Sequence, residues 1–270
     1  MHPHDAAGIR SDGPSGPCTS VIAAGPTGRI FHGRNLDWNV PPVIRSLLID
    51  VDFQRGGKTV FTGTTALGFV GLINGMRAGA DGYSASINAR HKGGKLLKNF
   101  LEALLHKAMT PAQHMRYAFE QATSFDTLVS TLSAGDLIDD IYYTVGGGAK
   151  GEGVVVARDR NDVADAWKLD VTNATDPDNW FRLQTNYDRT LPVPTSDDRR
   201  HPGIANMHTL GQAGAAANFD ASAHYAEKGL TNLWDVMTTW PTYNHHTDYS
   251  CVMSAANGTY ESFAWFPVEA

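Results

Sequence analysis

The sequence has little of what several protein classes require. Its two cysteines, Cys18 and Cys251, are too few for a disulfide framework in a chain of 270 residues. No apolar run approaches the length of a membrane-spanning helix. The net charge is -6, which gives no basic surface of the kind that nucleic acid requires. None of the eleven histidines has metal-ligand spacing, so we predict no metal site. We also predict no cofactor and, from the charge, no nucleic-acid partner.

The first 17 residues differ in composition from the rest of the chain. They hold three glycines, three prolines and few large apolar side chains. They lack the apolar central run of a secretory signal peptide, so none is predicted. We expect residues 1–17 to be a leader that is flexible or removed, and residues 18–270 to form a single catalytic domain. Glycosylation sequons at Asn173 and Asn257 weakly indicate a secretory compartment.

The hydrophobic pattern predicts strands, then helices, then strands again, which is typical of an α+β fold. The expected strands span residues 19–23, 29–32, 47–53, 59–63, 66–72, 82–88, 141–145, 153–158, 164–169, 180–186, 249–255 and 261–266. The expected helices span residues 95–109, a segment beginning at Pro111, residues 124–132 and part of 221–237, with Thr110 and Ser124 as N-caps. The first two strands form a hairpin that begins at the first cysteine.

Cys18 stands at the boundary between the leader and the first strand. If the Pro17–Cys18 bond is cut, Cys18 gains a free α-amino group, whose reference pKa is ~7.7–8.0. That amine can take the proton of its own thiol, so nucleophile and base share one residue. The alternative for any lone cysteine is a small buried hydrophobe, which is our reading of Cys251. A disulfide between the two is not expected.

Polar residues that could assist Cys18 follow in three places. The hairpin brings Arg34 and Asp37 back beside it, where they could hold a substrate and the amine, or merely form a salt bridge with each other. Asn186 ends a predicted strand and could donate to an oxyanion, or form an Asx-turn. Arg199 could pair with the neighbouring aspartates or reach the site.

The sequence resembles the family of N-acylethanolamine-hydrolyzing acid amidase and acid ceramidase from Cys18 nearly to its end. The matching segments are Cys18-Thr19-Ser20-Val21-Ile22, His32-Gly33-Arg34-Asn35-Leu36-Asp37, Phe61-Thr62-Gly63-Thr64-Thr65, Gly68-Phe69-Val70-Gly71-Leu72, Asp140-Ile141-Tyr142-Tyr143-Thr144-Val145-Gly146-Gly147, Gly151-Glu152-Gly153-Val154-Val155, Thr185-Asn186-Tyr187-Asp188, Asp197-Asp198-Arg199-Arg200 and Pro241-Thr242-Tyr243-Asn244. Several of them are nearer the amidase branch than the ceramidase branch.

This resemblance implies an αββα N-terminal-nucleophile hydrolase sandwich. Family members are lysosomal glycoproteins that cleave themselves before the cysteine and hydrolyse amides of long-chain fatty acids. By position, Cys18 matches the nucleophile, Arg34 and Asp37 the pair beside it, Asn186 the oxyanion-side asparagine, and Arg199 an arginine near the site. The resemblance therefore implies a fatty-acid amide substrate and a lysosomal or secretory location.

Two departures from the family bear on activity. Ala89 occupies the position of a glutamate implicated in self-cleavage and catalysis, and alanine can neither donate nor accept a proton. Family precursors also carry a helical N-terminal subunit that helps form a lipid-facing surface. The resemblance implies that this subunit is supplied separately and that the chain contacts a membrane or micelle surface, unless the chain is a truncated or shorter relative. The alternative functions are a catalytically impaired lipid-binding relative and an amidase acting on bile-salt, penicillin or peptidoglycan-like amides.

Overall fold

Two antiparallel sheets form the centre of the protein in a computed structural model that describes residues 17–90, 108–218 and 229–266. The five-stranded sheet has the order β10 (Phe181–Gln184), β1 (Cys18–Ala24), β2 (Ile30–Leu36), β11 (Tyr249–Ser254) and β12 (Thr259–Ala264). The seven-stranded sheet has the order β3 (Leu48–Arg55), β4 (Lys58–Ala66), β5 (Asn74–Arg77), β6 (Tyr83–Ala89), β7 (Ile141–Gly147), β8 (Gly153–Arg158) and β9 (Val163–Lys168).

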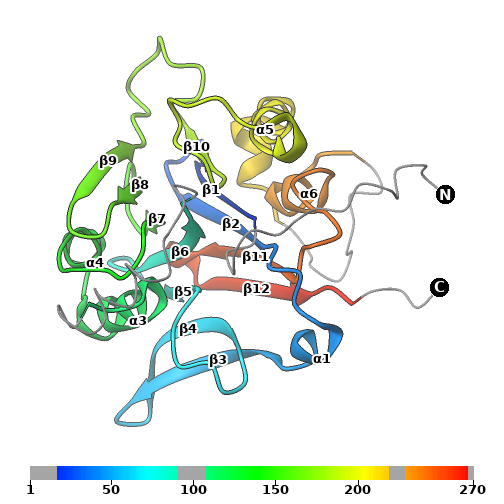
Figure 1. Ribbon diagram of the computed structural model, residues 1–270. Coiled ribbons are helices and arrows are strands. Elements are labelled where there is room, and N and C mark those ends of the chain that lie inside the picture. The colour runs from blue at the N-terminus through cyan, green and yellow to red at the C-terminus, as the bar shows by residue number, and fades with distance from the viewer. Residues whose placement is uncertain (1–16, 91–107, 219–228, 267–270) are drawn as a thin grey trace.

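Helices cover the outer faces of both sheets (Figure 1). The helices α3 (Pro111–Gln121) and α4 (Phe125–Ser133) lie on the seven-stranded sheet, where α4 contacts β7 and β8. The helices α5 (Arg200–Ala215) and α6 (Leu233–Thr238) lie on the five-stranded sheet and contact β1, β2 and β11. Shorter elements are α1 (Pro42–Arg45), η1 (Thr195–Asp197) and η3 (Ala255–Asn257). The helix–sheet–sheet–helix layering confirms the predicted α+β sandwich.

Local signals placed most elements correctly. Thr110 and Ser124 each accept a backbone N–H three residues on and complete a capping box, as their residue types predict. The β1–β2 hairpin begins at Cys18, which pairs with Leu36. The predicted leader, apart from Pro17, lies outside the described residues. So do almost all of the predicted helix 95–109 and the first part of the segment 221–237.

One local prediction was wrong, and two elements of the sandwich were missed. Residues 66–72 do not form a strand, because β4 ends at Ala66 and a turn follows in which Gly68 has a φ of 89°. The short strand β5 was not predicted. Helix α5 was also missed, because Pro202 and three glycines dilute its pattern, and Gly211 interrupts it with a φ of 70°.

The five-stranded sheet has two chemically different faces. Its outer face packs against α5 and α6 through an apolar cluster that includes Val21, Phe31 and Met237. Its inner face is polar near β6, where it meets the seven-stranded sheet. We call this buried set the polar inter-sheet layer; its members are Ser20, His32, Arg34, Ser84, Ser86 and Asn88. Strand alternation separates the two faces residue by residue.

Candidate active site

Cys18 lies on the inner face of the five-stranded sheet. As the first residue of β1, it is held by pairing with Leu36 on β2, and its exposed fraction is 1%. Neither Cys18 nor Cys251 forms a disulfide, in agreement with the expectation from the sequence. Burial raises the pKa of the Cys251 thiol well above its ordinary value, which fits a structural residue.

Arg34 approaches the Cys18 thiol from the neighbouring strand. Two residues before Leu36, it shares the inner face, and its Nη2 donates to Cys18 Sγ at 3.1 Å. Its Nη1 donates to Asn88 Oδ1 at 2.9 Å, and the whole side chain is buried. Within the described residues, no carboxylate forms an ion pair with Arg34. The guanidinium therefore directs its charge at the sulfur.

Asp37 follows directly after β2 and is fully buried. Its carboxylate accepts hydrogen bonds from Thr247 Oγ1 at 2.7 Å and Asn244 Nδ2 at 3.2 Å, and lies 3.6 Å from Arg199 Nη1. The salt-bridge alternative for Arg34 and Asp37 was therefore wrong. Burial raises the pKa of Asp37, while Arg199 and the hydrogen bond from Thr247 oppose the rise. The backbone N–H of Asp37 donates to Pro17 O at 3.1 Å, so it touches the bond expected to be cut.

Asn186 and Arg199 hold the backbone of Cys18. Asn186 Oδ1 accepts from the Cys18 N–H at 2.7 Å and from Arg199 Nη2 at 2.8 Å. Arg199 Nη1 donates to Cys18 O at 2.5 Å, while Nε pairs with Asp197 at 2.8 Å. Arg199 thus both pairs with an aspartate and reaches the site. Asn186 bonds to distant residues, so the Asx-turn alternative was wrong.

Ala89 is the last residue of β6 and lies beside Asn186. Its carbonyl accepts a hydrogen bond from Asn186 Nδ2 at 2.8 Å, which occupies one of the two amide protons. Strand alternation puts the Ala89 side chain on the opposite face of β6 from Asn88. No side-chain atom of Ala89 can transfer a proton.

Six residues around this group were not identified from the sequence as functional candidates. They are His32, Ser84, Ser86, Asn88, Asn244 and Thr247. The alternation of Ser84, Ser86 and Asn88 was the available signal, but alternating polar residues usually indicate a solvent-facing strand. Burial lowers the pKa of His32 to about 3, and Arg34 adds to this effect, so the ring is neutral.

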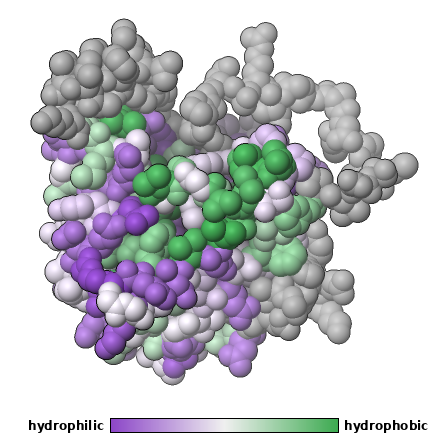
Figure 2. Space-filling view, turned by 90° about the horizontal axis from the view of Figure 1, so that it is seen from below, coloured by the Kyte–Doolittle hydropathy of each residue, from purple (hydrophilic) through white to green (hydrophobic). Residues whose placement is uncertain are grey.

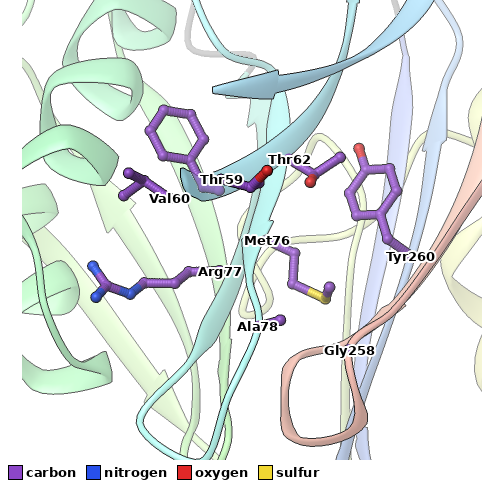
Figure 3. A pocket seen from close by; sticks show the side chains of 9 residues that line it. Thr59, Val60, Thr62, Met76, Arg77, Ala78, Gly258 and Tyr260 are labelled. Atoms are coloured by element: carbon purple, nitrogen blue, oxygen red, sulfur yellow. The ribbon is translucent and has the colours of Figure 1, made fainter. Parts of the chain in front are cut away.

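Two surface features lie away from this group. A cavity of about 370 Å³ opens between β4, β5 and β12, and Figure 3 shows Thr62, Met76 and Tyr260 on its border. Figure 2 shows hydrophobic residues gathered over part of the underside of the molecule. Large exposed apolar side chains on α1 and after β4 include Val43, Leu67 and Val70, which are 65%, 66% and 71% exposed.

The described residues hold neither a metal-ligand cluster nor a membrane-spanning helix. No group of three or more His, Cys, Asp and Glu side chains there is arranged to hold a metal ion. No helix of the described part is long and apolar enough to cross a membrane. Both sequon asparagines, Asn173 and Asn257, are exposed.

Comparison with known proteins connects this geometry with two related hydrolases. No family model matches the chain. The rat N-acylethanolamine-hydrolyzing acid amidase is 39% identical over 239 residues, which cover 88% of this chain and 60% of the relative. Mouse acid ceramidase is 30% identical, covering 91% of this chain and 61% of the relative. The chain therefore spans about three fifths of the length of these relatives.

A solved structure extends the match to three dimensions. The Caenorhabditis elegans N-acylethanolamine-hydrolyzing acid amidase ortholog superposes with a TM-score of 0.75 and 29% identity. The match covers 92% of this chain and 100% of that one. The sandwich and the sequence similarity agree: over about nine tenths of its length this chain is similar to the N-acylethanolamine-hydrolyzing acid amidases and acid ceramidases, and it has the fold of an N-terminal-nucleophile hydrolase.

Proposed function

We propose that this protein is a cysteine amidase that hydrolyses fatty-acid amides, such as N-acylethanolamines or ceramide-like lipids, to a fatty acid and an amine. The observation that carries the proposal is the set of contacts made to Cys18. Asn186 binds the N–H of Cys18, Arg199 binds its carbonyl, and Arg34 binds its sulfur. Any buried residue needs partners for its backbone groups. A charged donor on the sulfur and an amide fixed at the nitrogen are in addition what a nucleophile and its later α-amine require.

The proposed first step is cleavage of the Pro17–Cys18 bond. Cys18 Sγ attacks the Pro17 carbonyl carbon, and the Asp37 N–H that already donates to Pro17 O stabilises the oxyanion. The C–N bond breaks, and the proton lost by the thiol passes to the Cys18 nitrogen, which becomes the free α-amine. Water then hydrolyses the thioester and releases the leader. Since the thiol is buried while Pro17 is attached, turnover follows this step.

In turnover, the Cys18 thiolate attacks the substrate's amide carbon. The α-amine accepts the thiol proton and passes it to the leaving amine. The second Nδ2 proton of Asn186 stabilises the oxyanion, while Arg34 holds the sulfur. Water, deprotonated by the same α-amine, then hydrolyses the thioester and releases the fatty acid. Asp37 and Arg199 keep the amine and the Asn186 amide in position.

The wider setting follows from the same proposal. The exposed apolar side chains at Val43, Leu67 and Val70 support contact with a lipid surface or with a separately supplied N-terminal subunit. The exposed positions of Asn173 and Asn257 are compatible with glycosylation, and hence with a lysosomal route.

The deciding experiment combines intact-mass measurement of the purified protein with fatty-acid release at acidic pH. We expect a species that starts at Cys18 and releases palmitate from N-palmitoylethanolamine, with ceramide as the comparison substrate. A chain that keeps its leader and releases fatty acid from neither lipid, with or without a supplied N-terminal subunit, would contradict the proposal.

A second candidate function rests on Ala89. If the family glutamate is indispensable, the protein is a lipid-binding relative that neither cleaves itself nor turns over substrate. Ala89→Glu separates the candidates. A large gain in cleavage and turnover favours the impaired relative, whereas an active wild type that changes little favours the amidase.

A further inference from the structure

The polar inter-sheet layer contains a hydrogen-bonded chain that ends at the nucleophile. His32 Nε2 lies 2.8 Å from Ser86 Oγ, and Ser86 Oγ lies 2.8 Å from Ser20 Oγ. Ser20 donates to Asn88 Oδ1 at 2.7 Å, and the same oxygen accepts from Arg34 Nη1. Every one of these side chains is fully buried, so water does not compete for the contacts. The mechanism above uses only Arg34 from this set.

Counting the available protons assigns a donor and an acceptor to each hydrogen bond in this series. Asn88 Nδ2 donates to Gln184 O and Thr185 O, so its Oδ1 must accept. Ser20 spends its only proton on Asn88, and Ser86 must therefore donate to Ser20. The Ser86 oxygen is then an acceptor for His32, which fixes the proton on Nε2. His32 Nδ1 is left to accept from Ser84 at 3.0 Å, in place of the longer 3.4 Å contact from Ser84 to Gly146 O.

Arg34 depends on this chain more than an ordinary arginine would. Its Nε has no hydrogen-bond partner, and no described carboxylate pairs with it. Nη1 is therefore anchored chiefly by Asn88, with a longer 3.5 Å contact to Ser20. With so few hydrogen bonds, the orientation of the guanidinium depends on how firmly its acceptor is itself fixed.

We propose that His32 is a positioning residue for the nucleophile: through Ser86, Ser20 and Asn88 it orders the acceptor that holds Arg34 against the Cys18 sulfur. The neutral ring suits this task, because the chain needs a donor at Nε2 and an acceptor at Nδ1. The groups facing the ring are Ser84 and Ser86 from β6 and, on its own strand, the charged Arg34. The proposal rests on the proposed function only for the turnover measurements.

The test is a matched pair of substitutions at one position. His32→Phe keeps a flat ring but removes the donor, whereas His32→Gln restores an N–H near the Nε2 position. We expect the Phe variant to lower kcat on the order of 10- to 100-fold while KM stays within about twofold. We expect the Gln variant to recover most of the loss. Thr144→Val is the control and leaves kcat unchanged. Thr144 lies on β7, next to β6, and its buried hydroxyl has no hydrogen-bond partner.

A second measurement needs no substrate. In the species that starts at Cys18, the rate at which iodoacetamide alkylates Cys18, followed by peptide mass across a pH series, should fall in His32→Phe and recover in His32→Gln. Cys251 alkylation in the same samples reports general loosening of the fold and should not change. If the wild type releases no fatty acid, the proposed function fails, but this comparison still tests the positioning role.

Three results would overturn the positioning role. The first is normal kcat and normal Cys18 alkylation in His32→Phe. The second is an equal loss in the Phe and Gln variants. The third is a His32→Phe/Ser86→Ala double variant whose loss is the product of the single losses, because members of one chain should not add independently. If His32→Phe does not fold, Ser86→Ala carries the same kcat and alkylation comparison alone.

Discussion

The two faces of the five-stranded sheet are both buried, yet one is held by apolar packing and the other by hydrogen bonds. On the outer face, Val21 and Phe31 pack in an apolar cluster with Met237 of α6, without directional bonds. On the inner face, Ser20 and His32 belong to a chain of hydrogen bonds in which each donor has an assigned acceptor. Apolar packing tolerates changes of shape better than a polar chain tolerates loss of one partner. The outer face should therefore govern stability, and the inner face reactivity.

The largest effect expected from this comparison is on activity alone. Cys18→Ala should abolish leader cleavage and lower turnover by more than about 10³-fold, because the nucleophile is gone. Cys251→Ala removes a thiol that is equally buried on the same face and should keep activity. Intact mass and fatty-acid release measure both. Cleavage or turnover that survives in Cys18→Ala would eliminate this residue as the nucleophile.

Next in size is a change on the outer face. Met237 is fully buried against Gly33, and Met237→Ala should lower the free energy of unfolding by about 2–5 kcal/mol. Urea denaturation measures the loss. The kcat of the folded fraction should stay near that of the wild type. A large fall in kcat at unchanged stability would show that the two faces are not separable.

A smaller effect is expected where the inner face meets the thiol. Arg34→Met keeps the length and apolar stem of the side chain but removes the charge beside Cys18. Turnover should fall about 10²-fold, which corresponds to about 2.7 kcal/mol of lost stabilisation of the reacting sulfur. Cys18 alkylation should slow in parallel. Arg34→Lys is the control, since it keeps the charge but cannot contact Asn88 and Cys18 at the same time through two nitrogens.

The smallest expected effect compares His32 on the inner face with a buried histidine outside the five-stranded sheet. Burial lowers the pKa of His32 to about 3 and that of His114, a buried residue of α3, to about 4. Each binds a proton in the unfolded chain below about pH 6.5 but not in the folded protein, so stability present above that pH is lost as pH falls. Between the folded pKa of about 4 and the ordinary value of 6.5, His114→Gln should reduce the slope of stability against pH by about 1.4 kcal/mol per pH unit. An unchanged slope in chemical denaturation would refute this assignment.

Local sequence signals predicted what is local. The β1–β2 hairpin and the caps at Thr110 and Ser124 depend on residues close in the chain, and all were identified. Family motifs supplied Arg34, Asp37, Asn186 and Arg199, which the structure brings together around Cys18, although their roles stay predictions. Helix α5 was missed because its glycines and Pro202 hide an element that tertiary packing stabilises.

The polar inter-sheet layer could not be predicted from the sequence for a physical reason. Ser84, Ser86 and Asn88 alternate as a solvent-facing strand would, and nothing local indicates that a second sheet covers them. Their partners, Ser20 and His32, are more than fifty residues away. Contacts of this kind follow from which sheets stack, and a single sequence does not specify that stacking.

The hydrogen bonds around Pro17 and Cys18 also set an order of events. The Cys18 N–H is held by Asn186, 168 residues downstream, and the Pro17 carbonyl is held by Asp37 after β2 has paired. A chain still emerging from the ribosome cannot present its bond in this way until residue 186 has been made and docked. The proposed cut at this bond would therefore come late in the life of each molecule, and the missing leader would mark the copies whose assembly is complete.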